Sequence, residues 1–105
     1  MQVIHVKEIV SGDVYVARAT REFRGSVLGN PFRIGRDGTR EEVIEKYRRW
    51  LKEEIKKEGL VYQELVKLVN LYRENPNIRL ACWCKPQGCH GDVIVKAVIW
   101  LNEHI

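Results

Sequence analysis

The chain has 105 residues, of which 45% are hydrophobic and 30% are charged, and its formal net charge is +4. This length suffices for one domain and one core but not for two, so we expect a single domain over residues 1–105. No apolar run approaches the ~20 residues that span a bilayer, and the first residues lack the pattern of a signal peptide. We therefore expect a cytoplasmic protein with no membrane partner, and the abundance of Lys and Glu hints at a thermophilic source.

The first third of the chain predicts two strands and a long loop. Residues 2–9 alternate apolar and polar side chains and predict the first strand. A turn signal at residues 11–13, followed by the β-branched and aromatic stretch 14–18, predicts a second strand that pairs with the first as a hairpin. Residues 19–38 keep no helical or strand period. Irregular segments of this length are uncommon in compact domains unless they are functional.

The rest of the chain predicts two helices, a strand and a final helix. Thr39 with Glu42 forms the sequence pattern of a capping box, and Gly59 is expected to close this first helix in a left-handed conformation. A second helix ends at residues 75–77, and the apolar stretch 78–83 predicts a strand in the centre of the sheet. An amphipathic helix follows. The order β-β-loop-α-α-β-α predicts an α/β fold with a mixed sheet of about three or four strands and about three helices.

Positive charge is concentrated in the long loop. The arginines between residues 17 and 36 are Arg18, Arg21, Arg24, Arg33 and Arg36, against one acid, Glu22. Five minus one is four, so this segment accounts for the whole net charge of +4. Guanidinium groups fit phosphate bidentately, and the cluster therefore indicates an anionic ligand or a nucleic acid. A solvated basic loop is the alternative.

The segment "LACWCKPQGCHGD", residues 80–92, contains all three cysteines of the chain. It is predicted to run from a strand through a loop into a helix, which is where α/β proteins bind ligands. One interpretation is a zinc site formed by Cys82, Cys84, Cys89 and His90, although the adjacent residues Cys89 and His90 point in different directions. A second is a disulfide between Cys84 and Cys89.

A functional thiol is the third interpretation. Cys89 lies at a predicted helix N-terminus beside His90, and both features are expected to lower the pKa of its thiol and make it a candidate nucleophile. The backbone N–H groups of residues 88–90 are expected to face an anion. Asp92 falls in the first helical turn and is either a cap or a third catalytic group. Cys82, on the central strand, is expected to be a small buried hydrophobe.

Three stretches, "GSVLGNPF", "DGTREEVIEKYRRWL" and "LACWCKPQGCHGDVI", resemble in this order the domain of unknown function family 4326, small proteins of bacteria, archaea and their viruses. The resemblance extends from about Val14 to Leu101. The motif positions are Gly25, Gly29, Asn30, Pro31 and Phe32 in the loop, with Cys82, Trp83, Cys84, Pro86, Cys89, His90, Gly91 and Asp92. The resemblance implies where the site lies and implies no reaction.

The two unusual segments lead to one functional hypothesis. We expect the Arg-rich GNPF loop to fold over the Cys–His loop and form a single pocket. The expected ligand-binding residues are Arg18, Gly29, Asn30, Arg36, Gln87 and Gly88. The expected ligand is a nucleotide or another phosphorylated or anionic molecule, bound with or without catalysis by Cys89, His90 and Asp92. The alternatives are a nucleic-acid-binding module stapled by zinc, and a structural protein, such as a homo-oligomer, whose cysteines only pack.

Overall fold

Three parallel strands form the sheet of this protein. The computed structural model describes all residues, Met1–Ile105, and strand β3 (Arg79–Cys82) lies between β1 (Gln2–His5) and β2 (Val14–Tyr15). Both outer strands pair with β3 in parallel, and no strand of the sheet is antiparallel. The expected number of strands is confirmed, whereas the expected mixture of parallel and antiparallel pairing is wrong.

Strand β3 is central because it is apolar on both faces. Leu80 and Cys82 point to one face and Ala81 to the other, and all three are fully buried. Strands buried on both faces have continuous apolar sequences, which is the signal that predicted this position.

The predicted hairpin between the first two strands is wrong. Strand β1 ends at His5, and the chain then forms the short 3₁₀ helix η1 (Val6–Glu8) before it reaches the turn at Gly12. The intervening residues carry the chain past β3, so that β2 runs in the same direction as β1. Arg79 of β3 holds this connection through a 2.7 Å ion pair with Asp13 and a hydrogen bond to the carbonyl of Glu8.

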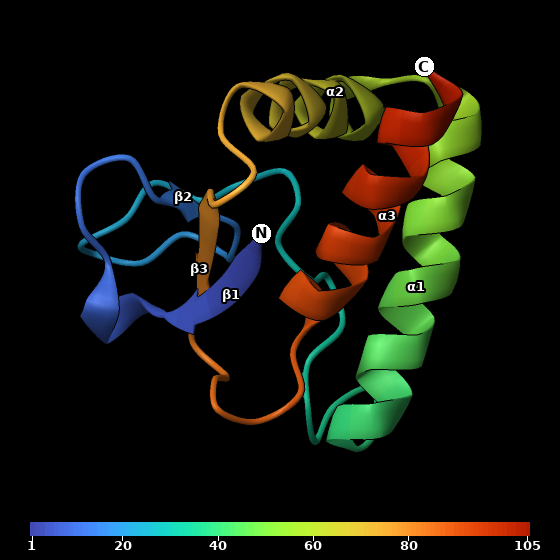
Figure 1. Cartoon of the computed structure of the whole chain (residues 1–105). Helices are drawn as coiled ribbons and strands as arrows, with labels where there is room; N and C mark the ends of the chain where they lie inside the picture. Colours follow the sequence, from blue (N-terminus) through green and yellow to red (C-terminus); the bar gives the residue numbers. More distant parts are fainter.

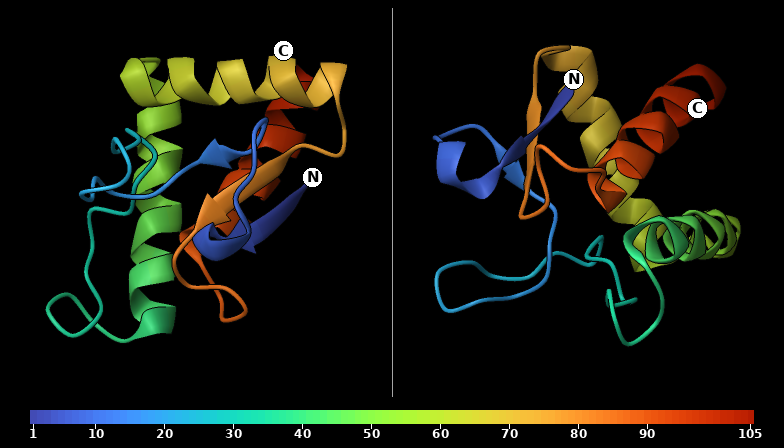
Figure 2. Two further views of the ribbon diagram at one scale, coloured as in Figure 1. Left: turned by 90° about the vertical axis from the view of Figure 1, so that its left-hand side faces the viewer. Right: turned by 90° about the horizontal axis from the view of Figure 1, so that it is seen from below.

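Three helices complete the fold in the predicted order. They are α1 (Arg40–Lys57), α2 (Leu60–Glu74) and α3 (His90–His104). Figure 1 shows α1 and α3 side by side on one side of the sheet, and Figure 2 shows α2 crossing the far ends of both. None of the three helices has the length and apolar character that crossing a membrane requires.

The first helix begins as predicted and ends one residue earlier. The Thr39 hydroxyl accepts the N–H of Glu42, and the Glu42 carboxylate accepts the N–H of Thr39, which confirms the capping box. Glu58, with φ of 53°, is the left-handed residue that closes α1. Gly59, expected in that role, is instead the N-cap of α2. The turn between the two helices therefore consists of Glu58 and Gly59 alone.

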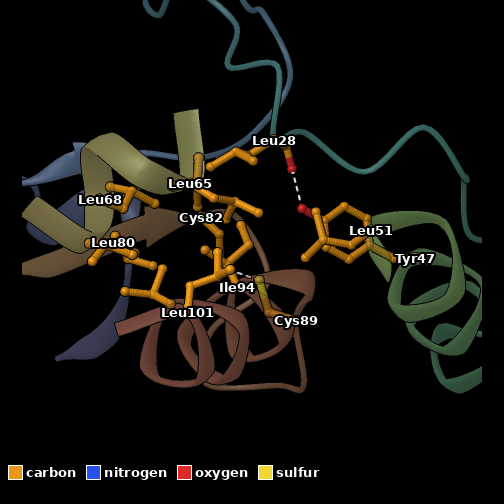
Figure 3. Packing of buried hydrophobic residues seen from close by; sticks show 13 residues of the cluster. Leu28, Tyr47, Leu51, Leu65, Leu68, Leu80, Cys82, Cys89, Ile94 and Leu101 are labelled. Carbon is orange, nitrogen blue, oxygen red and sulfur yellow. Dashed lines mark hydrogen bonds between the residues drawn. The ribbon is translucent and has the colours of Figure 1, made fainter. Parts of the chain in front are cut away.

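The sheet separates two unequal apolar clusters. The larger one lies between the sheet and the helices, and Figure 3 shows its leucines packed around Cys82, Cys89 and Ile94. The smaller one covers the opposite face, where Ile4 and Ala81 meet Val6 of η1 and the ring of Phe23. Parallel sheets are ordinarily covered on both faces, and here the second cover is η1 with part of the long loop.

The long segment between β2 and α1 is attached to the helices through Leu28. Its side chain belongs to the main core and is 1% exposed. The buried hydroxyl of Tyr47, on α1, donates a 2.6 Å hydrogen bond to the Leu28 carbonyl (Figure 3). A segment without strands or helices has few backbone partners of its own, so this bond fixes the position of its middle.

We expect Tyr47→Phe to lower the free energy of unfolding by about 1–2 kcal/mol, because the Leu28 carbonyl would lose its partner while remaining buried. Urea denaturation measures this change. Tyr62→Phe is the matched control, since Tyr62 is half-buried and its hydroxyl makes no hydrogen bond. Equal destabilisation by the two substitutions would contradict the anchoring role of Tyr47.

Candidate functional site

A cavity of about 460 Å³ lies where the long loop meets the Cys–His loop and the start of α1. Its walls come from residues 17–20, from residues 30–34, from the first turns of α1 and from the segment between β3 and α3. We call it the arginine pocket. Asn30 and Cys89 both line it, which confirms that the two loops share one pocket.

Three arginines line the arginine pocket, and no Asp or Glu does. They are Arg18, Arg33 and Arg40, and none of them takes part in an ion pair. Arg18 Nη1 donates to the Asn30 carbonyl at 3.1 Å, and Arg40 Nη1 donates to the Gly88 carbonyl at 3.1 Å. Neutral carbonyls therefore orient two of the guanidinium groups and leave their positive charge uncompensated.

The GNPF turn shapes the rim of the arginine pocket. The Asn30 side-chain oxygen accepts the N–H of Phe32 at 2.9 Å, and its amide nitrogen donates to the Val43 carbonyl at 3.4 Å. Gly29 lies outside the lining but packs closely against the preceding segment, where an added Cβ would stand 3.2 Å from Arg18 Cγ. A glycine here lets the turn lie directly against Arg18.

The six expected ligand-binding residues divide into two groups. Arg18, Asn30 and Gly88 line the arginine pocket. Gly29, Arg36 and Gln87 do not. The Arg36 guanidinium pairs with Asp37 at 2.8 Å and donates to the Pro31 carbonyl. These contacts stabilise the turn that contains Arg36.

Two of the three cysteines meet in the core below the pocket. The Sγ atoms of Cys82, at the end of β3, and Cys89, at the start of α3, are 2.6 Å apart (Figure 3). Cys82 is 0% and Cys89 1% exposed, and all three cysteines are free thiols. The sulfur that Cys89 contacts is thus Cys82 rather than Cys84, the partner considered in the disulfide interpretation.

The pKa values of the two buried thiols are shifted in opposite directions. The hydrogen bond from Cys89 lowers the pKa of Cys82 from the ordinary 9.0 to about 6, assisted by the backbone N–H groups of Cys84 and Lys85. The same hydrogen bond, together with burial, raises the pKa of Cys89. The expected direction for Cys89 is therefore wrong. The thiol whose pKa is lowered is that of Cys82, which sequence reasoning treated as a plain hydrophobe.

His90 is buried between the pocket and the core. Its Nε2 lies 2.7 Å from the Val16 carbonyl and therefore carries a proton, which leaves Nδ1 unprotonated, 3.6 Å from Cys89 Sγ. Burial lowers the pKa of His90, so the ring is neutral at physiological pH. The rings of His90 and Tyr47 lie nearly perpendicular to one another, with centroids 5.1 Å apart.

Asp92 caps α3 and does not reach the arginine pocket. One carboxylate oxygen accepts the N–H of Cys89 at 3.1 Å, and the other accepts Lys85 Nζ at 2.7 Å. The N–H of Gly91 is likewise bound, to Cys89 Sγ at 3.2 Å. Because the helix caps itself, the N–H of Cys89 is not free to bind an anion as expected.

The four residues expected as zinc ligands do not converge. No three side chains among the His, Cys, Asp and Glu residues are grouped as a metal would require. Cys84 lines the arginine pocket, Cys82 lies beneath it, and His90 is bound to the Val16 carbonyl. Zinc binding stays a prediction that would need these side chains to rearrange.

Among the charged and aromatic residues of the pocket wall, sequence reasoning gave no site role to Arg40 or Trp83 and did not expect Arg33 to bind the ligand. A cation such as Arg40 is electrostatically unfavourable in a first helical turn, and this was a usable signal. Trp83 was noted in the motif without a role. Its indole N–H donates to the Tyr15 hydroxyl at 2.8 Å, and its ring meets Phe23 edge-on, so a half-exposed aromatic surface is held at the pocket edge.

Comparison with known proteins gives a family and a viral relative. A family described as "Domain of unknown function (DUF4326)" matches residues 2–100. An uncharacterized 12.4 kDa protein from the nrdA-td intergenic region of Enterobacteria phage T4 is 36% identical over 76 residues, which are 71% of this chain. The match spans 62% of the phage protein's own length. No solved structure matches the chain.

The thiol pair makes stability depend on pH in a defined direction. The folded-state pKa of Cys82, about 6, lies below its ordinary 9.0, so the free energy of unfolding should rise as pH increases from about 6 to about 9. The raised pKa of Cys89 makes the free energy of unfolding fall as pH increases, but only above its ordinary pKa of 9.0 and therefore outside this interval. Urea denaturation across this interval measures the rise, and ultraviolet absorbance of the thiolate reports the titration directly.

Cys82→Ala should abolish both the pH-dependent rise and the thiolate absorbance near neutral pH. Cys84→Ala, which leaves the pair intact, is the control and should retain both. A thiolate signal that survives in Cys82→Ala and disappears in Cys84→Ala would show that the lowered pKa belongs to Cys84, and it would contradict this prediction.

Proposed function

Because the chain belongs to the DUF4326 family, which is described as a domain of unknown function, we propose its function from the site itself: the arginine pocket binds a small phosphorylated molecule of nucleotide size. The observation that carries the proposal is the convergence of Arg18, Arg33 and Arg40 on one cavity without any carboxylate. Uncompensated guanidinium groups around a concave site are a fitting environment for phosphate.

The remaining walls suit the rest of a nucleotide. Trp83 and Phe32 supply aromatic surface, and Ile34, Val43 and Ile44 supply aliphatic surface. The volume of about 460 Å³ falls within the range of small-molecule sites. An aromatic base stacked on Trp83, with its phosphate toward the arginines, would use both kinds of wall.

Binding is supported better than nucleophilic catalysis. Cys89 retains its proton, Cys82 is sealed in the core, and Asp92 is occupied by the cap and by Lys85. His90 is the one member of the expected catalytic set whose geometry favours a chemical role, since its unprotonated Nδ1 faces the Cys89 thiol.

A small ligand is also favoured over a nucleic-acid strand. The three arginines face one bounded cavity, whereas strand-binding surfaces spread their cations along a groove. Arg21 and Arg24, which would extend a basic stripe, lie outside the lining.

Calorimetric titration with adenosine 5′-monophosphate, adenosine and inorganic phosphate tests the proposal, followed by the other nucleoside monophosphates. We expect the monophosphate to bind more tightly than either fragment. Arg18→Gln and Arg40→Gln should each weaken binding about tenfold or more, because a hydrogen bond to a charged group contributes about 1.5–3 kcal/mol.

Arg24→Gln is the matched control, because it removes a cation of the same loop that neither lines the pocket nor makes a hydrogen bond. Equal losses of affinity in Arg24→Gln and Arg18→Gln would mean that only the overall charge of the protein matters, and this would contradict the proposal. Tighter and steeply salt-dependent binding of a single-stranded oligonucleotide would favour the nucleic-acid alternative instead.

A further inference from the structure

A second concave surface, the α1/α3 groove, runs between α1 and α3 on the outside of the helical layer. It encloses about 680 Å³ and meets the arginine pocket at Gly88 and Cys89, which line both. Figure 1 shows the two helices lying side by side with their N-termini at the same end, so the groove follows their common direction. The proposed ligand site does not account for this surface, which borders the main core at Leu51 and Cys89.

The floor of the groove is apolar. Leu51 and Ile55 of α1 and Val93 and Ala97 of α3 form it, and the indole of Trp100, 53% exposed, stands at its far end. A large exposed aromatic beside aliphatic side chains is a common feature of protein interaction sites.

The rims of the groove carry cations. Arg48, Lys52 and Lys56 follow one another at four-residue intervals along α1, and Lys96 stands on the α3 side. The single carboxylate of the lining, Asp92, is already paired with Lys85. Arg48 and Lys56 are each paired with a glutamate of their own helix.

Lys52 of α1 and Lys96 of α3 both line the groove, and neither makes an ion pair. Both ammonium groups can therefore bind the carboxylates of a partner without first breaking an existing ion pair.

We propose that the α1/α3 groove binds an amphipathic helix with acidic edges, supplied by a partner protein. The apolar face of such a helix would lie on the floor, and its carboxylates would meet the lysines on both rims, which is a known mode of helix recognition. Cations at four-residue intervals repeat every ~6 Å along α1, which matches carboxylates spaced four residues apart on an adjacent helix.

The distribution of charge selects this partner over three others. A single-headed amphiphile would need one cation at one end of the groove, whereas four are spread along both rims. A second copy of this chain would bring a groove of the same charge. A nucleic-acid backbone would gain nothing from the apolar floor.

The probe is a synthetic peptide of about four helical turns with leucines on one face and glutamates along both edges, labelled for fluorescence anisotropy. The double substitution Lys52→Glu and Lys96→Glu should weaken its binding at least tenfold. The matched control reverses two exposed cations outside the groove that make no ion pair, Lys7→Glu with Arg24→Glu, and should change affinity less than about twofold.

Two further measurements distinguish peptide binding in the groove from non-specific attraction by surface charge. A peptide with lysines in place of its glutamates should bind the Lys52→Glu, Lys96→Glu variant and not the unaltered chain. Ala97→Phe, which fills the floor without changing charge, should also abolish binding while circular dichroism shows the helices intact.

Absence of binding to the unaltered chain, or equal weakening by the control pair, would overturn the proposal. So would self-association of the chain that buries Trp100 and excludes the peptide. Binding of adenosine 5′-monophosphate, measured in parallel, should be unchanged by the groove substitutions, so failure of this proposal leaves the arginine pocket untouched.

Discussion

The hydrogen bond between the Tyr47 hydroxyl and the Leu28 carbonyl is the constraint on which the rest of the molecule depends. The segment between β2 and α1 has no secondary structure, and it supplies half of the lining residues of the arginine pocket, including Arg18 and Arg33. Without a fixed point, its arginines would separate under their own repulsion. Leu28 in the core and its carbonyl on Tyr47 provide that point, and the His90 contact with the Val16 carbonyl provides a second at the start of the segment.

Local structure could be predicted because its causes are local. The capping box of Thr39 and Glu42 depends on residues three apart, and the central position of β3 depends on an uninterrupted apolar stretch. The pairing of β1 and β2 depends instead on how the chain passes β3, which the turn signal near Gly12 does not encode. A hairpin was the simplest assumption, and the ion pair that contradicts it joins residues far apart in the sequence, Asp13 and Arg79.

The sequence predicted which segments form the site, but it did not predict which partners each side chain would contact. Composition alone brought the arginine loop and the cysteine loop together as the two chemically unusual parts of the chain. It could not show that Arg36 would turn toward Asp37, or that Arg40 would point across to the Gly88 carbonyl. Those choices depend on which carbonyls and carboxylates the fold brings within reach, and a sequence contains no such distances.

The sulfur pair explains why the thiols of this chain are gathered in one segment. A buried charge is tolerated only with hydrogen-bonding or charged partners. The Cys82 thiolate has the Cys89 thiol, two backbone N–H groups and the Lys85 ammonium, and all of them come from the loop that joins β3 to α3. Cys89 of this pair, together with Gly88, forms the wall that the arginine pocket shares with the α1/α3 groove. Unpaired cations line both surfaces, Arg18, Arg33 and Arg40 in the pocket and Lys52 and Lys96 in the groove, and the geometry of both surfaces depends on this one loop.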